Sequence, residues 1–186
     1  MKAVRFAVPL AALAIFACAD ARAQEAKTHV VDARGLKLQV PTDWKQAKAT
    51  SSMRAAELKV DPAEGDDYPA ELVVFVFPGG AGGVDANVDR WRKMFKDENG
   101  AAPKAETSKI ASKAGEVARV ETSGHYHPAQ FPGRAAEPDR DGARLLGAIL
   151  VSDGSGYFIR MIGPDETMRK LAPRFDEMLK ALDFAK

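Results

Sequence analysis

The strongest hydrophobic pattern in the chain is Glu71–Phe77, ELVVFVF, in which six consecutive side chains are leucine, β-branched or aromatic. A run of this kind is shielded from water only if both faces of a strand are buried, so it predicts a strand at the centre of a sheet. The glycine-rich segment PGGAGG follows at 78–83 and leads into an amphipathic helix. The apolar positions of that helix recur at helical spacing: Val84, Val88, Trp91 and Phe95.

Shorter apolar runs separated by turn residues predict the other strands. They span 28–40 (a hairpin around Gly35 that ends at Pro41), 53–60, 107–113, 116–126, 144–151 and 157–162. The last two are joined by Asp153-Gly154-Ser155-Gly156, a strong hairpin signal. Within 116–126, Val117 and Val120 lie on opposite faces of a regular strand, so this strand requires either a bulge or burial on both faces.

A second helix opens at Gly163-Pro164-Asp165-Glu166, with a proline whose missing amide costs nothing there and acids at the positive end of the helix dipole. Its apolar stripe continues to Leu182 and is interrupted by Pro173, which predicts a kink or a split. Hairpins combined with only two helices predict an α+β fold. We expect a largely antiparallel β-sheet of about six or seven strands flanked by helices.

The first 23 residues have the parts of a secretion signal. Lys2 and Arg5 precede an uncharged apolar run from Phe6 to Ala17, and Ala21-Arg22-Ala23 forms a small-x-small cleavage site. We therefore expect residues 1–23 to be a signal peptide and residues 24–186 to form a single α+β domain. This domain would be periplasmic or secreted after cleavage near Ala23.

Cys18, the only cysteine, lies inside this leader. The segment Ile15-Phe16-Ala17-Cys18 loosely resembles the lipobox of bacterial lipoproteins, so a lipid anchor at Cys18 is an alternative, although the bulky Phe16 fits that motif poorly. With cleavage near Ala23 the mature domain has no cysteine. Disulfides and thiolate chemistry are then excluded.

The net charge of the chain does not indicate a class of partner. The chain has 27 basic and 26 acidic residues, and removal of the leader leaves 24 and 25, so the formal charge falls from +1 to −1. A near-neutral domain without a basic block lacks the surface on which nucleic-acid binding depends, and we expect no nucleic-acid partner. No segment reaches the roughly 20 apolar residues of a transmembrane helix. The remaining expectation is an unknown protein or small-molecule partner.

Two histidines give the candidate site. His125 and His127 are two residues apart at a strand end, so both imidazoles face one side, a spacing used for zinc or copper. A third ligand would come from His29, Glu121 or an acid in the following loop at 127–142, which is rich in proline and charge.

Other chemistry is weakly indicated. PGGAGG satisfies neither GxGxxG nor GxxxxGK[ST], and Asp85 would place a negative charge where a phosphate should sit. Ser123 near His125 lacks the G-x-S-x-G elbow of a hydrolase. We therefore assign no catalytic residue and no cofactor.

The order of elements resembles the Mog1/PsbP-like group. The resemblance consists of the opening hairpin, the P-x-x-W step at Pro41 to Trp44, a buried strand feeding a helix, and a closing strand–GP–helix that ends in Phe175-x-x-Met178-Leu179. It implies a curved antiparallel sheet in an α/β/α sandwich, and accessory or binding roles rather than catalysis. The leading hypothesis is an exported, non-enzymatic binding or accessory domain that contacts its partner through the sheet face or the 127–142 loop. The alternative is a periplasmic metal-binding protein that uses His125 and His127.

Overall fold

One large antiparallel sheet, here called the main sheet, organises the computed structural model, which describes residues 27–128 and 138–185. The predicted signal peptide, Cys18 and residues 129–137 of the predicted loop lie outside the described residues. The strands of the main sheet follow one another in this order: β3 (Lys45–Gln46), β4 (Arg54–Val60), β5 (Ala70–Pro78), β10 (Ser155–Pro164), β9 (Arg140–Ser152), β8 (Gly115–Tyr126) and β6 (Phe95–Lys96), with β7 (Glu106–Ser112) also paired to β8. The predicted α+β fold with a large antiparallel sheet is confirmed. The main sheet has eight strands. Two of them, β3 and β6, were not predicted, because strands of two residues are too short to show a pattern in the sequence.

The strand predicted from ELVVFVF is β5, which lies inside the main sheet between β4 and β10. Leu72, Val74 and Val76 are buried on one face of the sheet, here called the first face. Phe75 and Phe77 point to the second face and are only half-buried. The central position is therefore confirmed, but the expectation of full burial on both faces is wrong, because the second face is covered over only part of its width.

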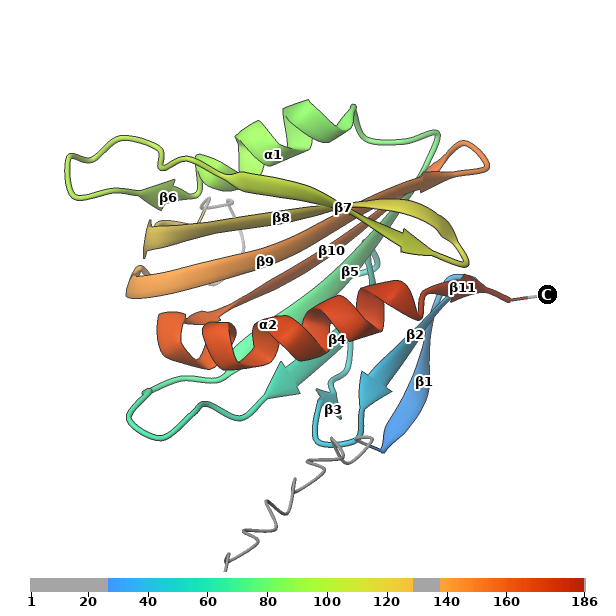
Figure 1. Ribbon diagram of the computed structural model, residues 1–186, viewed down its shortest axis with the longest axis horizontal. Helices are drawn as coiled ribbons and strands as arrows, with labels where there is room; N and C mark the ends of the chain where they lie inside the picture. The colour runs from blue at the N-terminus through green and yellow to red at the C-terminus, as the bar shows by residue number, and fades with distance from the viewer. Residues whose placement is uncertain (1–26, 129–137, 186) are drawn as a thin grey trace, which may run out of the picture.

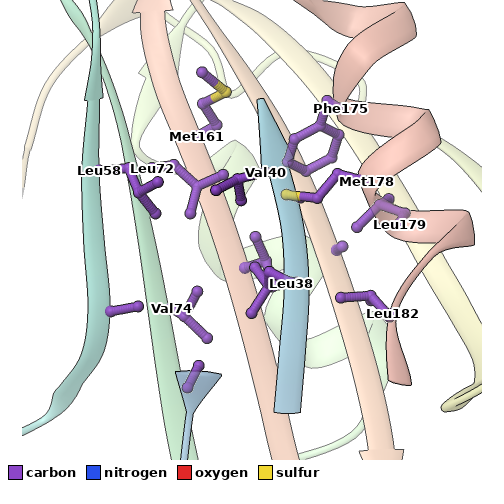
Figure 2. Packing of buried hydrophobic residues seen from close by; sticks show 14 of the residues in the cluster. Leu38, Val40, Leu58, Leu72, Val74, Met161, Phe175, Met178, Leu179 and Leu182 are labelled. Atoms are coloured by element: carbon purple, nitrogen blue, oxygen red, sulfur yellow. The ribbon is translucent and has the colours of Figure 1, made fainter. Parts of the chain in front are cut away.

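The first face is covered by α2 (Asp165–Lys180) and by a small sheet made of β1 (Thr28–Ala33), β2 (Leu36–Pro41) and β11 (Asp183–Phe184) (Figure 1). Side chains from the main sheet, the small sheet and α2 meet in the larger core, which Figure 2 shows from close by. The residues labelled there come from β2, β4, β5, β10, α2 and the turn that follows it: Leu38, Val40, Leu58, Leu72, Val74, Met161, Phe175, Met178, Leu179 and Leu182. Burial of this many apolar side chains is the main source of stability for a fold without disulfides.

The second face is covered by α1 (Val84–Arg92), a helix of nine residues that packs over β8 and β9. Trp91 reaches the sheet at Gly147 of β9, where a Cβ atom would lie only 2.3 Å from Cζ3 of the indole. This close approach requires glycine. The predicted helix ends at Arg92, earlier than expected, because Phe95 leaves it to pair with Tyr126 as part of β6 and is fully buried there.

The closing helix α2 begins where the sequence predicted, directly after Pro164, with Asp165 and Glu166 in its first turn. Pro173 does not split it. The proline lies on the exposed side of the helix, whereas the residues packed on the sheet continue on both sides of it, so tertiary packing outweighs the local cost of about 3 kcal/mol. Neither helix in the described part of the chain has the length and apolarity that a bilayer crossing requires.

An ion-pair network also fixes α2 to the strands beneath it. Arg119 of β8 contacts Asp176 of α2 at 2.6 Å and Glu121 at 2.8 Å. Glu121 is also paired with Arg144 of β9, and Arg144 reaches Asp165 at the start of α2 at 2.7 Å. The network ties both ends of the helix to the same pair of strands.

Candidate metal centre

The two candidate histidines lie where β8 ends. Val117 belongs to the core of the first face and Val120 to that of the second, so β8 is buried on both sides, as one of the two predicted alternatives required. Tyr126 also belongs to the second-face core. Because neighbouring side chains of a strand alternate, His125 and His127 on either side of Tyr126 project toward the opposite face.

A β-bulge brings carboxylates to the histidines. Gly124 pairs with Ala143 and Tyr126 with Arg140, so one residue of β8 stands opposite two of β9, Asp141 and Gly142. Gly142 has φ of 58°, a left-handed conformation that glycine adopts at low cost. Bulges of this kind re-aim side chains, and here the bulge places Asp141 beside His125.

His125, His127, Asp139 and Asp141 together form a group that we call the His–Asp cluster. Asp139 Oδ2 lies 2.8 Å from Nδ1 of His127 and 3.4 Å from Nε2 of His125. One ligand atom from each of these three residues falls within 4.8 Å of the others. The remaining carboxylate, that of Asp141, lies 2.5 Å from Nδ1 of His125. His125 is therefore held on one nitrogen while its other nitrogen faces Asp139.

The cluster is open to solvent, with side-chain exposure of 36% for His125, 49% for His127 and 44% for Asp139. Hydrogen bonds that the His125 ring donates to the carboxylates of Asp141 and Asp139 raise the pKa of His125. The same contacts, chiefly that with His127, lower the pKa of Asp139, so its carboxylate is ionised at neutral pH. Two imidazoles and an ionised carboxylate are a ligand set that suits zinc or copper.

The sequence left three sources open for a third ligand, and the structure places them differently. Asp139 and Asp141 are both acids of the predicted 127–142 loop and both lie beside the histidines, and Asp139 is the one that contacts both of them. His29 lies on β1, in the small sheet. Glu121 is bound by Arg119 and Arg144 in the network described above.

The glycine-rich segment does not form an anion site. Gly79, Gly80 and Gly82 have φ between 80° and 86°, so the segment uses the positive angles that glycine allows. The buried side chain of Asn87 donates hydrogen bonds to the carbonyl oxygens of Ala81, Gly82 and Gly83 at 2.9–3.3 Å. Asn87 thus closes the segment with carbonyl groups directed inward, whereas a phosphate cradle needs amide groups directed at the ligand.

Ser123 and His125 do not form the nucleophile–base pair of a serine hydrolase. Both ring nitrogens of His125 face carboxylates, Asp141 on one side and Asp139 on the other, so neither is directed at Ser123. General-base catalysis would need that contact.

A pocket that no pattern in the sequence indicated lies on the open part of the second face; we call it the sheet-face pocket. It has a volume of about 380 Å³ and is lined by residues of β4, β5, β8, β9 and β10, among them Arg54, Val73, Arg140 and Arg160. These residues are far apart in the chain and come together only through the pairing of the strands. No local spacing could have indicated them.

No protein-family model matches the sequence, and no curated protein is significantly similar to it. Solved structures with a similar course of the chain include a protein from Bacteroides thetaiotaomicron VPI-5482 (12% identity, TM-score 0.48) and the protein of unknown function PA94 from Pseudomonas aeruginosa (12%, 0.47). A third is LpqN of Mycobacterium tuberculosis, described as involved in cell envelope biogenesis (15%, 0.49). They cover 87%, 87% and 89% of this chain, which itself spans 49%, 99% and 94% of theirs. None of these likenesses bears on what the chain binds.

Proposed function

We propose that the protein is an exported, non-enzymatic accessory domain that binds a divalent transition metal, zinc or copper, at the His–Asp cluster. The observation that carries this proposal is that Oδ2 of Asp139 lies beside both Nε2 of His125 and Nδ1 of His127, with one ligand atom from each residue within 4.8 Å of the others. The leader at 1–23 supports export, and the antiparallel sheet with a helix on each face fits the Mog1/PsbP-like resemblance.

The spacing of the three ligand atoms suits a metal ion. Zinc bonds to nitrogen and oxygen are about 2.0–2.2 Å long, so two ligand atoms of a tetrahedral site lie roughly 3.4 Å apart. Asp139 Oδ2 stands 3.4 Å from Nε2 of His125 and 2.8 Å from Nδ1 of His127, distances close to that spacing. Three protein ligands leave a fourth position for water or for a group of a partner.

Asp141 would orient His125 as a metal ligand. Metal-bound histidines usually donate their other ring N–H to a carboxylate, which fixes the tautomer and the ring orientation. Asp141 stands in that position at Nδ1 of His125, so with a metal bound Nδ1 would keep its proton and Nε2 would present its lone pair to the metal. Because the Asp141 side chain is 94% exposed, we place its contribution at the low end of the usual range, about tenfold in affinity.

A non-enzymatic role fits the surroundings of the cluster. Catalytic metal sites act in enclosed pockets, where water is excluded and electrostatic interactions are strong. The His–Asp cluster lies on the surface, and the sheet-face pocket is on the other side of the same strand ends.

The proposal is tested by zinc and copper titration of chelator-stripped protein, in competition with a chromophoric chelator. We expect a dissociation constant in the micromolar range or lower for the wild type. The affinity should fall at least 100-fold in the His125→Ala/His127→Ala double variant and about tenfold in Asp141→Asn. His29→Ala is the matched control because His29 lies in the small sheet, and it should bind like the wild type.

Circular dichroism separates loss of ligands from loss of fold, since the substituted side chains are exposed. Absence of uptake by the wild-type protein at micromolar metal would refute metal binding. Equal affinity of the double variant and the wild type would refute the assignment of the site.

A further inference from the structure

The sheet-face pocket is where the second face is left uncovered by α1. Its floor is formed by β4, β5 and β10, and its wall by Tyr126 at the end of β8, Arg140 at the start of β9 and Tyr68 from the loop before β5. The volume of about 380 Å³ lies in the range of small-molecule sites. It shares no side chain with the His–Asp cluster.

The lining of the pocket is positively charged. It contains the four basic side chains of Arg54, Lys59, Arg140 and Arg160 and the two acidic side chains of Glu57 and Glu71, a formal excess of two positive charges. In a chain whose charge is close to zero, this is a local concentration of one sign.

One of the two carboxylates serves to fix a guanidinium. Glu57 is only 3% exposed and lies 3.0 Å from NH1 of Arg54. It also accepts hydrogen bonds from the backbone amide and the hydroxyl group of Thr50, at 3.2 and 3.3 Å. All three contacts are made by Oε2 of Glu57, which holds Arg54 in the lining of the pocket with 13% of its side chain exposed.

Tyr68 contributes to the pocket lining a hydroxyl group that can donate a hydrogen bond. Its hydroxyl oxygen is buried and has no hydrogen-bond partner within residues 27–128 and 138–185. The guanidinium of Arg140 stacks over its ring at 3.9 Å from the centroid, which fixes both side chains. Burial raises the pKa of Tyr68, so the phenol stays protonated and can donate at neutral pH. Buried polar groups without partners are rare in native proteins and call for an explanation such as a ligand.

We propose that the sheet-face pocket binds a small organic carboxylate with an apolar body. The carboxylate would accept hydrogen bonds from the Tyr68 hydroxyl group and from the guanidinium of Arg140, while the body would lie against Val73 and Ile162 on the floor. Arginine suits this task because its planar fork matches the two oxygens of a carboxylate.

The test is calorimetric titration with sodium benzoate and sodium hexanoate, and with benzyl alcohol and hexanol as neutral counterparts. We expect saturable binding of at least one carboxylate and binding at least tenfold weaker for its alcohol. Tyr68→Phe keeps the ring under Arg140 and removes only the hydroxyl group, so it should weaken carboxylate binding about tenfold; Arg140→Gln should weaken it at least as much. Arg169→Gln on α2, outside the pocket, is the control for a lost positive charge and should leave binding unchanged.

Each titration is repeated in a chelator and with the His125→Ala/His127→Ala variant, and unchanged carboxylate affinity there shows that the pocket acts independently of the metal centre. Absence of saturable binding up to 10 mM carboxylate, roughly the weak limit for a site of this size, would overturn the proposal. Equal affinity for acid and alcohol, or wild-type affinity in both pocket variants, would overturn it as well.

Discussion

The contact between Trp91 and Gly147 provides a sharp test of how α1 is attached to the sheet. In Gly147→Ala the new methyl group would lie 2.3 Å from Cζ3 and 2.7 Å from Cε3 of the indole, where ordinary contacts begin near 3.4 Å. The indole, and α1 with it, must therefore move by about 1 Å. Overpacking of this kind costs about 1–3 kcal/mol, and complete loss of the Trp91 packing sets a ceiling of about 3–5 kcal/mol. We expect about 2–3 kcal/mol for Gly147→Ala.

A double-mutant cycle separates this clash from other effects. Trp91→Ala removes the group that collides, so the Trp91→Ala/Gly147→Ala variant should be about as stable as Trp91→Ala alone, with a coupling energy of about 2 kcal/mol. Urea unfolding followed by far-UV circular dichroism measures all four proteins without relying on tryptophan fluorescence. Gly83→Ala is the control, because Gly83 at the start of α1 has φ of −71° and no neighbouring atom within 4 Å of a Cβ. Additive costs of the two substitutions would refute the proposed contact, as would a cost of Gly147→Ala below about 0.5 kcal/mol.

Two further predictions concern ion pairs. Glu121→Gln leaves Arg119 and Arg144, with 14% and 13% of their side chains exposed, without their shared carboxylate, so the free energy of unfolding should fall by about 1–2 kcal/mol in urea titrations at an unchanged m-value. An unchanged midpoint would show that the network contributes nothing. Hydrogen bonds from Arg174 lower the pKa of Asp43, so this pair stabilises the fold above the unfolded pKa near 3.8 and loses that effect as the pH falls through the lower folded value. Since Asp43 is 59% exposed, Asp43→Asn should cost at most about 1 kcal/mol at pH 7 and nothing at pH 2, and an equal cost at both pH values would contradict this reading.

The sequence was informative wherever a local pattern decides the structure. Six apolar residues located β5 in the middle of the sheet, and the hairpin at Asp153–Gly156 paired β9 with β10. What it could not show was how far the second face is covered, because that depends on the length of α1. The helix stops at Arg92 when Phe95 pairs with β8, a contact to a residue 31 positions away in sequence (Phe95↔Tyr126).

The candidate site also has parts that the local sequence predicts and parts that depend on strand pairing. The spacing of His125 and His127 predicted that both side chains share one face, since it depends only on the alternation of a strand. The position of Asp139 and Asp141 depends on the extra residue in β9, which shifts the register by one. The basic residues of the sheet-face pocket come from three strands and meet through pairing alone.

The place of β10 in the strand order has a consequence for how the chain reaches its final form. β10 is the last long strand of the sequence, yet it lies between β5 and β9 and is the link between the two halves of the main sheet. Until residues 155–164 have emerged, β5 and β9 each carry an open edge with unpaired backbone groups, and α2 has no continuous surface to cover. The main sheet is therefore complete only after β10 has been made and has paired with both β5 and β9.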